Sequence, residues 1–89
     1  MAWTIELSDS AARQLEKIDR SVQSRVRKFL HDRVAGLQNP RSIGETLKGE
    51  RFGEFWKYRV GDFRLIAKIE DERFVVVVLR VGHRREVYR

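Results

Sequence analysis

Apolar and polar side chains alternate over the first few residues of the chain. Trp3, Ile5 and Leu7 are apolar, and Thr4 and Glu6 separate them. A period of two places the apolar side chains on one side of an extended segment, because successive side chains point to opposite faces. Residues 3–7 are therefore predicted to form a strand with one buried face.

A helical period replaces this alternation in the region that follows. Residues 11–18 carry apolar side chains at helical spacing, and residues 8–10 before them offer side-chain oxygens that can cap a helix. A second, longer helix is predicted over residues 22–37, where apolar positions recur every three or four residues. Gly36 and Pro40 mark its end, because glycine suits a left-handed cap and proline cannot continue the helical hydrogen bonds.

Turn residues are concentrated in the second half of the chain, since all six glycines lie at or after position 36. Three runs rich in aromatic and β-branched residues are predicted to be strands, at 55–60, 63–69 and 74–81. Gly61-Asp62 forms a two-residue hairpin loop between the first two, and residues 70–73 form a polar loop between the last two. We therefore expect an antiparallel meander.

The resulting order of elements is β-α-α-β-β-β, with a connecting segment over residues 41–54. A chain of 89 residues can bury one hydrophobic core and has no room for a second domain. We therefore expect a single α+β domain over residues 1–89, in which an antiparallel sheet has the two N-terminal helices packed on one face.

Strand phase predicts which side chains of the meander face the helices. The inner face is expected to carry Trp56, Tyr58, Val60, Phe63, Leu65, Ala67, Ile69, Val75, Val77, Leu79 and Val81. The opposite, helix-free face is expected to gather the cations Lys57, Arg59, Arg64, Lys68 and Arg80. A basic terminal run, residues 83–89, follows the last strand and extends this charge.

Two interpretations of the basic face are possible. Any open antiparallel sheet has one solvated face, and Lys and Arg on strands also discourage edge-to-edge association. However, the acidic residues of this half fall mostly in predicted turns, so the strands carry cations that are almost unopposed. The cations also alternate with aromatic residues, which suits a groove that follows phosphates and stacks bases. We therefore favour a nucleic-acid-binding face.

Composition narrows the class of protein further. Lys and Arg number 19 against 13 Asp and Glu, giving a net charge of +6 that favours an anionic partner, either nucleic acid or an acidic protein. The absence of cysteine excludes disulfides, cysteine-bound zinc and a thiol nucleophile. Neither a secretory leader nor an apolar run of membrane-spanning length is present, so we expect a soluble, cytoplasmic protein without membrane contact. No carboxylate or histidine cluster suggests a metal site, so no metal or other cofactor is expected.

Three motifs in this sequence resemble the RelE branch of the RelE/ParE toxin superfamily. They are LKG at 47–49, YRVGDFRLI at 58–66 and VGHRREVY at 81–88, and length, charge and element order agree over essentially the whole chain. The resemblance implies a toxin of a type II toxin–antitoxin system: an mRNA endoribonuclease that acts on the ribosome and inhibits translation by a metal-independent attack of the RNA 2′-hydroxyl. It also implies a RelB-like acidic antitoxin as partner, with operator DNA contacted only through that antitoxin.

Two other functions remain open. The superfamily includes ParE-like inhibitors of DNA gyrase, which share the fold and need no nuclease site. A non-catalytic nucleic-acid-binding module would satisfy the basic charge alone. Phosphate-binding side chains at the motif positions favour the nuclease, because an inhibitor that binds only protein has no need of them.

The resemblance implies a catalytic set of Lys57, Arg59, Arg64, Arg84 and Tyr88. The second of these positions is often lysine in the family and is arginine here. The three arginines suit stabilisation of phosphate charge, because a guanidinium stays protonated and donates two parallel hydrogen bonds. Lys57 is then the candidate base or electrostatic helper, and Tyr88 is expected to stack on a base.

Four further residues are expected to bind the substrate around this set: Lys68, Arg80, His83 and Arg85. Histidine is a residue type suited to acid–base chemistry near neutral pH. A lone histidine after a strand is, however, more often a solvated loop residue, so His83 is assigned to substrate binding.

Overall fold

The computed structural model describes residues 2–47 and 55–86 of the 89-residue chain. In chain order the regular elements are β1 (Thr4–Leu7), α1 (Asp9–Glu16), α2 (Arg20–Lys28), a π-helical segment (Phe29–Val34), a first 3₁₀ turn (Pro40–Ile43), β2 (Glu45–Thr46), β3 (Phe55–Val60), β4 (Phe63–Glu70), a second 3₁₀ turn (Asp71–Arg73) and β5 (Val75–His83). Among these described residues, no helix is both long enough and apolar enough to cross a membrane.

The strands form one five-stranded sheet in the order β1-β5-β4-β3-β2. The antiparallel meander β3-β4-β5 is present as predicted. The sheet differs from the expected one because it is mixed: β1 pairs with β5 in parallel, and the connecting segment adds the short strand β2 beside β3. Alternation in the sequence identifies a strand but not its partner, which is decided by where the helices return the chain.

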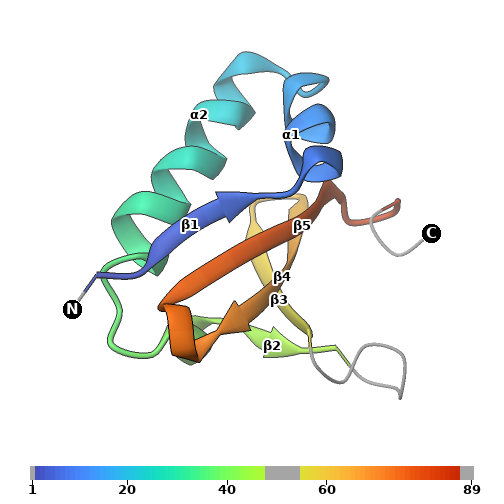
Figure 1. Ribbon diagram of the computed structural model, residues 1–89. Helices are drawn as coiled ribbons and strands as arrows, with labels where there is room; N and C mark the ends of the chain where they lie inside the picture. The colour runs from blue at the N-terminus through green and yellow to red at the C-terminus, as the bar shows by residue number, and fades with distance from the viewer. Residues whose placement is uncertain (1, 48–54, 87–89) are drawn as a thin grey trace.

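Both predicted helices are present and lie together on one face of the sheet (Figure 1). The Ser8 side chain accepts a hydrogen bond from the Ala11 N–H (3.0 Å) and so caps α1. The second helix changes to π-helical geometry in its last turns, where the Ala35 N–H bonds to the Leu30 carbonyl (2.9 Å). The predicted α+β class and order of elements are therefore confirmed.

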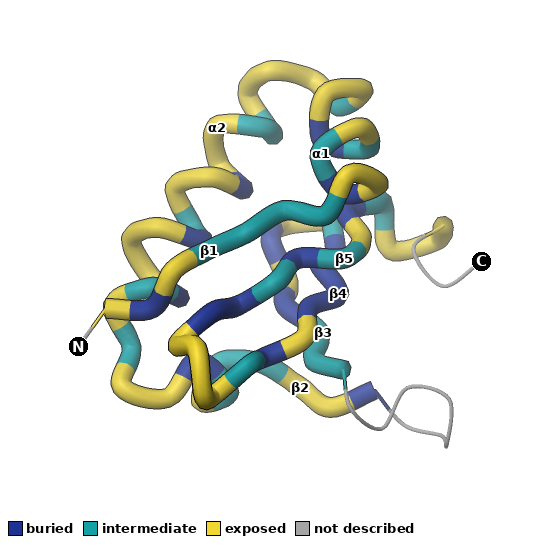
Figure 2. The backbone as a smooth tube through the Cα atoms, viewed as in Figure 1, coloured by how far each residue is buried: buried dark blue, intermediate teal, exposed yellow. Residues whose placement is uncertain are grey.

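The core lies between the helices and the inner face of the sheet, along β3, β4 and β5 (Figure 2). Its fully buried side chains include Leu15, Val26, Leu30 and Val34 from the helices and Tyr58, Leu65, Val76 and Val78 from the strands. The helix-free face carries a second, small cluster, in which Leu47 and Ile66 are buried with Phe55 packed against them.

The predicted phase of the last strand is wrong over its first half. Val76 and Val78 pack in the core with the helices, whereas Val75, Val77 and Leu79 were expected there. The pairing of β5 with β4 skips Leu79, which is the extra residue of a β-bulge. A bulge shifts the alternation of its strand by one position, so the predicted phase is correct again from Arg80 onward.

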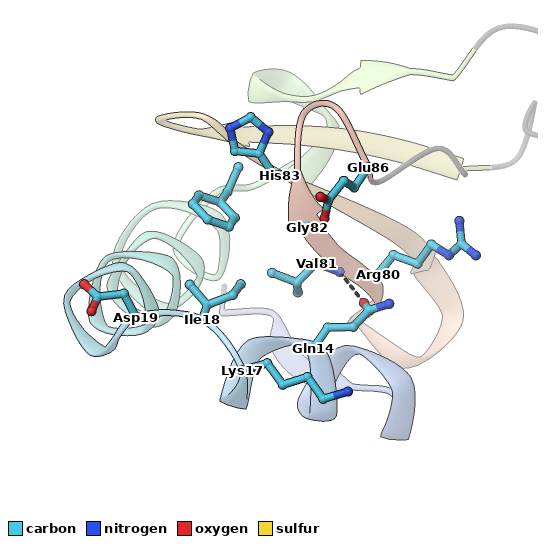
Figure 3. Close-up of a pocket in the computed structure, with 10 residues that line it drawn as sticks. Gln14, Lys17, Ile18, Asp19, Arg80, Val81, Gly82, His83 and Glu86 are labelled. Atoms are coloured by element: carbon cyan, nitrogen blue, oxygen red, sulfur yellow. Dashed lines mark hydrogen bonds between the residues drawn. The ribbon is translucent and has the colours of Figure 1, made fainter.

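Helix α1 also covers the edge of β5 that extends beyond β1. Ser8 donates its N–H to the Val78 carbonyl (2.9 Å) and its hydroxyl to the Leu79 carbonyl (3.1 Å). The side-chain oxygen of Gln14 accepts the Val81 N–H (2.8 Å), as Figure 3 shows. These bonds satisfy backbone groups that β1 is too short to pair, and they fix the course of the chain as it approaches the end of β5.

Candidate functional site

The sheet face opposite the helices carries the basic residues in register. Arg59 of β3 lies directly opposite Arg64 of β4. One row further from the hairpin, Lys57 lies opposite Ile66, which is in turn opposite Arg80 of β5. Residues directly opposite on neighbouring strands project to the same face, so these four cations share the hairpin end of this surface.

Arg84 reaches the same end of the sheet through the main chain. Its N–H donates to the carbonyl of Asp62 in the hairpin turn (2.8 Å). Gly82, two residues earlier, pairs with Arg64. The exposed Arg84 therefore lies next to the row formed by Arg59 and Arg64. We name these residues, together with Lys57 and Arg80, the basic cluster.

Arg64 differs from the other members of the basic cluster because it is buried, with 8% of its surface exposed. Its Nη1 donates to the carbonyls of Gly61 and Phe63, both at 2.9 Å, so the guanidinium spans the hairpin turn. Gly61 has a φ of 59°, a backbone conformation that favours glycine. Arg64 thus braces the turn, in addition to presenting charge at this end of the sheet.

A carboxylate lies within the basic cluster, which sequence reasoning missed. Glu45 of β2 is directly opposite Lys57, and the Lys57 Nζ is 3.4 Å from its Oε2. The expectation of almost unopposed cations is therefore wrong for Lys57. A strand of two residues is too short to show alternation, and the one local clue was the position of Glu45 just before the 47–49 motif. Neither Arg59 nor Arg84 pairs with a carboxylate of the described residues.

The predicted substrate-binding residues are spread more widely. Lys68 is exposed in a third row, opposite Phe55 and further from the hairpin. Arg85 is exposed after the end of β5. His83 lies opposite Phe63, with the two rings edge to face at 5.8 Å, and its Nδ1 accepts the Arg85 N–H (3.3 Å). His83 is therefore on the helix side of the sheet, away from the basic cluster. Tyr88 lies outside the described residues.

A cavity of about 490 Å³ opens beside His83, between the end of β5 and the turn that joins the helices. Its apolar lining includes Ile18, Phe63 and Val81, and its polar lining includes Lys17 and Glu86. Figure 3 shows the Ile18 and Val81 side chains turned toward each other across the cavity. The molecule thus has a basic surface on one side of the sheet and a partly apolar cavity on the other.

The chain is similar to known proteins over nearly its full length. A family model described as the ParE toxin of the type II toxin–antitoxin system parDE matches residues 5–88. Toxin RelG of Mycobacterium tuberculosis is 34% identical over 89 residues, which cover 100% of this chain and 99% of the relative. The mRNA interferase toxin RelE of Escherichia coli K12 is 31% identical over 90 residues, covering 99% and 92% of the two chains.

The fold agrees with that of a chain in a solved toxin–antitoxin complex. The crystal structure of the toxin–antitoxin complex RelBE2 from Mycobacterium tuberculosis contains a chain that superposes with a TM-score of 0.84 at 29% identity, covering 97% of this chain and 95% of that one. The superfamily suggested by the three motifs is thereby confirmed. The chain belongs to the ParE toxin family of type II toxin–antitoxin systems, within the RelE/ParE superfamily.

Proposed function

We propose that this toxin is a ribosome-dependent endoribonuclease that cleaves translated mRNA and thereby inhibits translation. The observation that carries the proposal is the basic cluster, in which strand register and the Arg84 main-chain bond gather five cations at the hairpin end of the helix-free face. A compact cluster of guanidinium groups suits the transition state of phosphate cleavage, where negative charge builds up on the phosphoryl oxygens. The name of one relative supports this assignment, since it is an mRNA interferase toxin.

The proposed reaction uses the RNA's own 2′-hydroxyl as the nucleophile. The 2′-oxygen attacks the adjacent phosphorus while the bond to the 5′-oxygen of the next nucleotide breaks, leaving a cyclic phosphate and a free 5′-hydroxyl. Arg59 and Arg84 are exposed and are assigned to the phosphoryl oxygens, because a guanidinium can bind two of them at once. Arg64 holds the hairpin turn that follows Arg59 in the chain. Tyr88 is assigned to base stacking.

We further propose that an acidic antitoxin is the toxin's protein partner and silences it. The related RelBE2 structure is a toxin–antitoxin complex, which supports a partner of this class. The cavity beside His83 combines an apolar lining with charged residues of both signs, which suits an amphipathic segment of the antitoxin. The charged lining residues are Lys17, Asp19, Arg80 and Glu86. Operator DNA would be contacted through the antitoxin, and the toxin would act in the cytoplasm, where its ribosomal target is found.

The competing function is inhibition of DNA gyrase, as in the ParE-like branch of the superfamily, and the matching family model is described as a ParE toxin. One experiment separates the two. Purified ribosomes translate a defined message in the presence of the toxin, cleavage is mapped by primer extension, and a gyrase supercoiling assay runs alongside. We expect cuts within the translated region and unchanged supercoiling. An intact message together with lost supercoiling would reject the nuclease.

Substitution of Arg84 by Ala tests the assigned site. We expect the single-turnover cleavage rate to fall about 100-fold, because transition-state charge loses one donor, while ribosome binding changes little. Arg13→Ala is the matched control, since Arg13 is an exposed arginine on α1, away from the basic cluster. Equal cleavage rates in the two variants would show that the site is wrongly assigned.

A further inference from the structure

The proposed cleavage needs a group that accepts the proton of the 2′-hydroxyl. Arginine cannot do this at neutral pH, because a guanidinium does not release its proton in proteins. The lysine of the set, Lys57, has its Nζ 3.4 Å from Glu45 Oε2, so this group is already engaged in an ion pair. The catalytic set implied by the sequence motifs therefore contains many groups that stabilise charge and no evident base.

Glu45 is the carboxylate that the fold adds to this set. It comes from β2, and β2 pairs with β3 so that Glu45 lies opposite Lys57, on the same face as the basic cluster. Neighbouring strands lie about 4.8 Å apart and advance about 6.8 Å over two residues, which places the Glu45 Cα about 8 Å from that of Arg59. A phosphate bound by Arg59 would thus have its 2′-hydroxyl within reach of the Glu45 carboxylate.

The ion pair holds this carboxylate in place and leaves it accessible. Lys57 Nζ lies 3.4 Å from Glu45 Oε2, and 59% of the Glu45 side chain remains exposed against 23% of the lysine. Lys57 therefore limits the positions that the carboxylate can take, while the carboxylate still faces solvent, where an RNA strand would approach. A carboxylate positioned by a neighbouring group can serve as a general base.

Two other acidic residues on this face, among those that the structure describes, are bound elsewhere. Glu6 and Glu70 both pair with Arg73, with contacts of 3.2 Å and 2.7 Å. Arg73 lies in the second 3₁₀ turn, which leads into β5 at the end opposite the β3–β4 hairpin. Of the ion-paired carboxylates among the described residues, Glu45 is therefore the one that adjoins the basic cluster.

We propose that Glu45 is the general base of the cleavage reaction and that Lys57 positions it. The Glu45 carboxylate takes the proton of the 2′-hydroxyl as the bond from the 2′-oxygen to phosphorus forms. The bond from phosphorus to the 5′-oxygen breaks, and the departing oxygen takes a proton from solvent. The carboxyl then returns its proton to solvent, so the cycle consumes no net proton.

This inference rests on the proposed function, and the experiment first establishes cleavage by the unaltered toxin on programmed ribosomes. Glu45→Gln keeps the size of the side chain and removes its basicity. We expect a single-turnover rate at least about 100-fold lower, with ribosome binding unchanged. Glu6→Gln is the matched control, because Glu6 is also a paired glutamate on the same face, and it should cleave at the unaltered rate.

Two readouts distinguish a base from a structural residue. If hydroxide must replace the missing base, the Glu45→Gln rate should rise about tenfold per pH unit above neutrality, a dependence that the unaltered toxin lacks. Formate should also restore part of the activity of Glu45→Ala, because it supplies a carboxylate to the vacated space. A Glu45→Gln rate within threefold of the unaltered one, or a low rate with neither hydroxide dependence nor formate rescue, would overturn the proposal. Failure of the unaltered toxin to cut any message would instead reject the proposed function itself.

Discussion

Arg64 illustrates how one side chain can combine a structural role with a proposed functional one. The strand pattern placed it among solvated cations, but its Nη1 bonds to two carbonyls of the hairpin turn and the residue is almost fully buried. A buried guanidinium needs such partners, because an unsatisfied charge removed from water is costly. Within the described part of the chain, the exposed Arg59 opposite it and the exposed Arg84 make no comparable side-chain hydrogen bonds.

We therefore predict that the arginines of the basic cluster differ in their contribution to stability. Arg64→Ala should lower the free energy of unfolding by about 1–3 kcal/mol, because two hydrogen bonds from a charged donor are lost. Arg84→Ala should change it by less than about 0.5 kcal/mol, as is usual for an exposed residue. Urea unfolding followed by circular dichroism measures both values. Equal midpoints for the two variants would contradict the bracing role of Arg64.

At the scale of elements, the first 3₁₀ turn determines where β2 and Glu45 lie. The Tyr58 hydroxyl donates to the carbonyl of Pro40, the first residue of this turn. Burial of the ring raises the pKa of Tyr58 to about 12. Just beyond the turn, a Cβ on Gly44 would lie 3.1 Å from the Tyr58 ring, a tighter contact than most side chains make, so this close approach favours glycine. The Arg41 guanidinium binds Asp71 with two hydrogen bonds of 2.9 Å and 2.7 Å, which connects the two 3₁₀ turns.

This ion pair predicts a pH dependence of stability. The hydrogen bonds from Arg41 hold the pKa of Asp71 below its ordinary value. A lowered pKa in the folded state means that the stabilisation is present above the ordinary Asp pKa, about 3.9, and is lost as the pH falls through the lower native value. The unaltered protein should therefore melt above Asp71→Asn at pH 7, and the difference should disappear in strong acid.

Thermal melting at a series of pH values checks this expectation. Both groups lie at the surface, so the difference should be small and should shrink in high salt. Asp19→Asn is a suitable control, because Asp19 contacts the Ser21 hydroxyl and no cation in the described residues. A melting difference for Asp71→Asn that stays constant from neutral to strongly acidic pH would show that the ion pair is not its source.

At the scale of the whole molecule, two surfaces lie on opposite sides of one core. The basic cluster occupies the helix-free face of the sheet, and the cavity beside His83 lies on the helix side at the end of β5. Apart from Arg80, which belongs to the basic cluster and also lines the cavity, the two surfaces use different side chains, so the proposed RNA substrate and the proposed antitoxin can be separated by mutation. The net charge of +6 favours an anionic partner for the molecule as a whole.

We predict that charge reversal at the cavity weakens antitoxin binding without slowing cleavage. Lys17→Glu places an acidic group at the cavity edge, where it would repel an acidic partner, and we expect the dissociation constant to rise about tenfold, equivalent to about 1.4 kcal/mol. Arg13→Glu changes the net charge equally on the same helix, outside the cavity lining. Calorimetric titration with the antitoxin encoded in the same operon measures both. Equal weakening by the two variants would place the antitoxin elsewhere.

The sequence by itself determined β1, the two helices and the three strands of the meander, their order, and the inner face of β3 and β4, because hydrophobic period and turn residues are local properties. It also determined the family, through motifs that include Arg59, Arg64 and Arg84 of the basic cluster. Only the tertiary structure decided the parallel partner of β1, the bulge at Leu79, the burial of Arg64 and the position of Glu45 beside Lys57. Each of these depends on contacts between residues distant in the chain, and a local pattern of side chains carries no information about which distant segment will lie beside it.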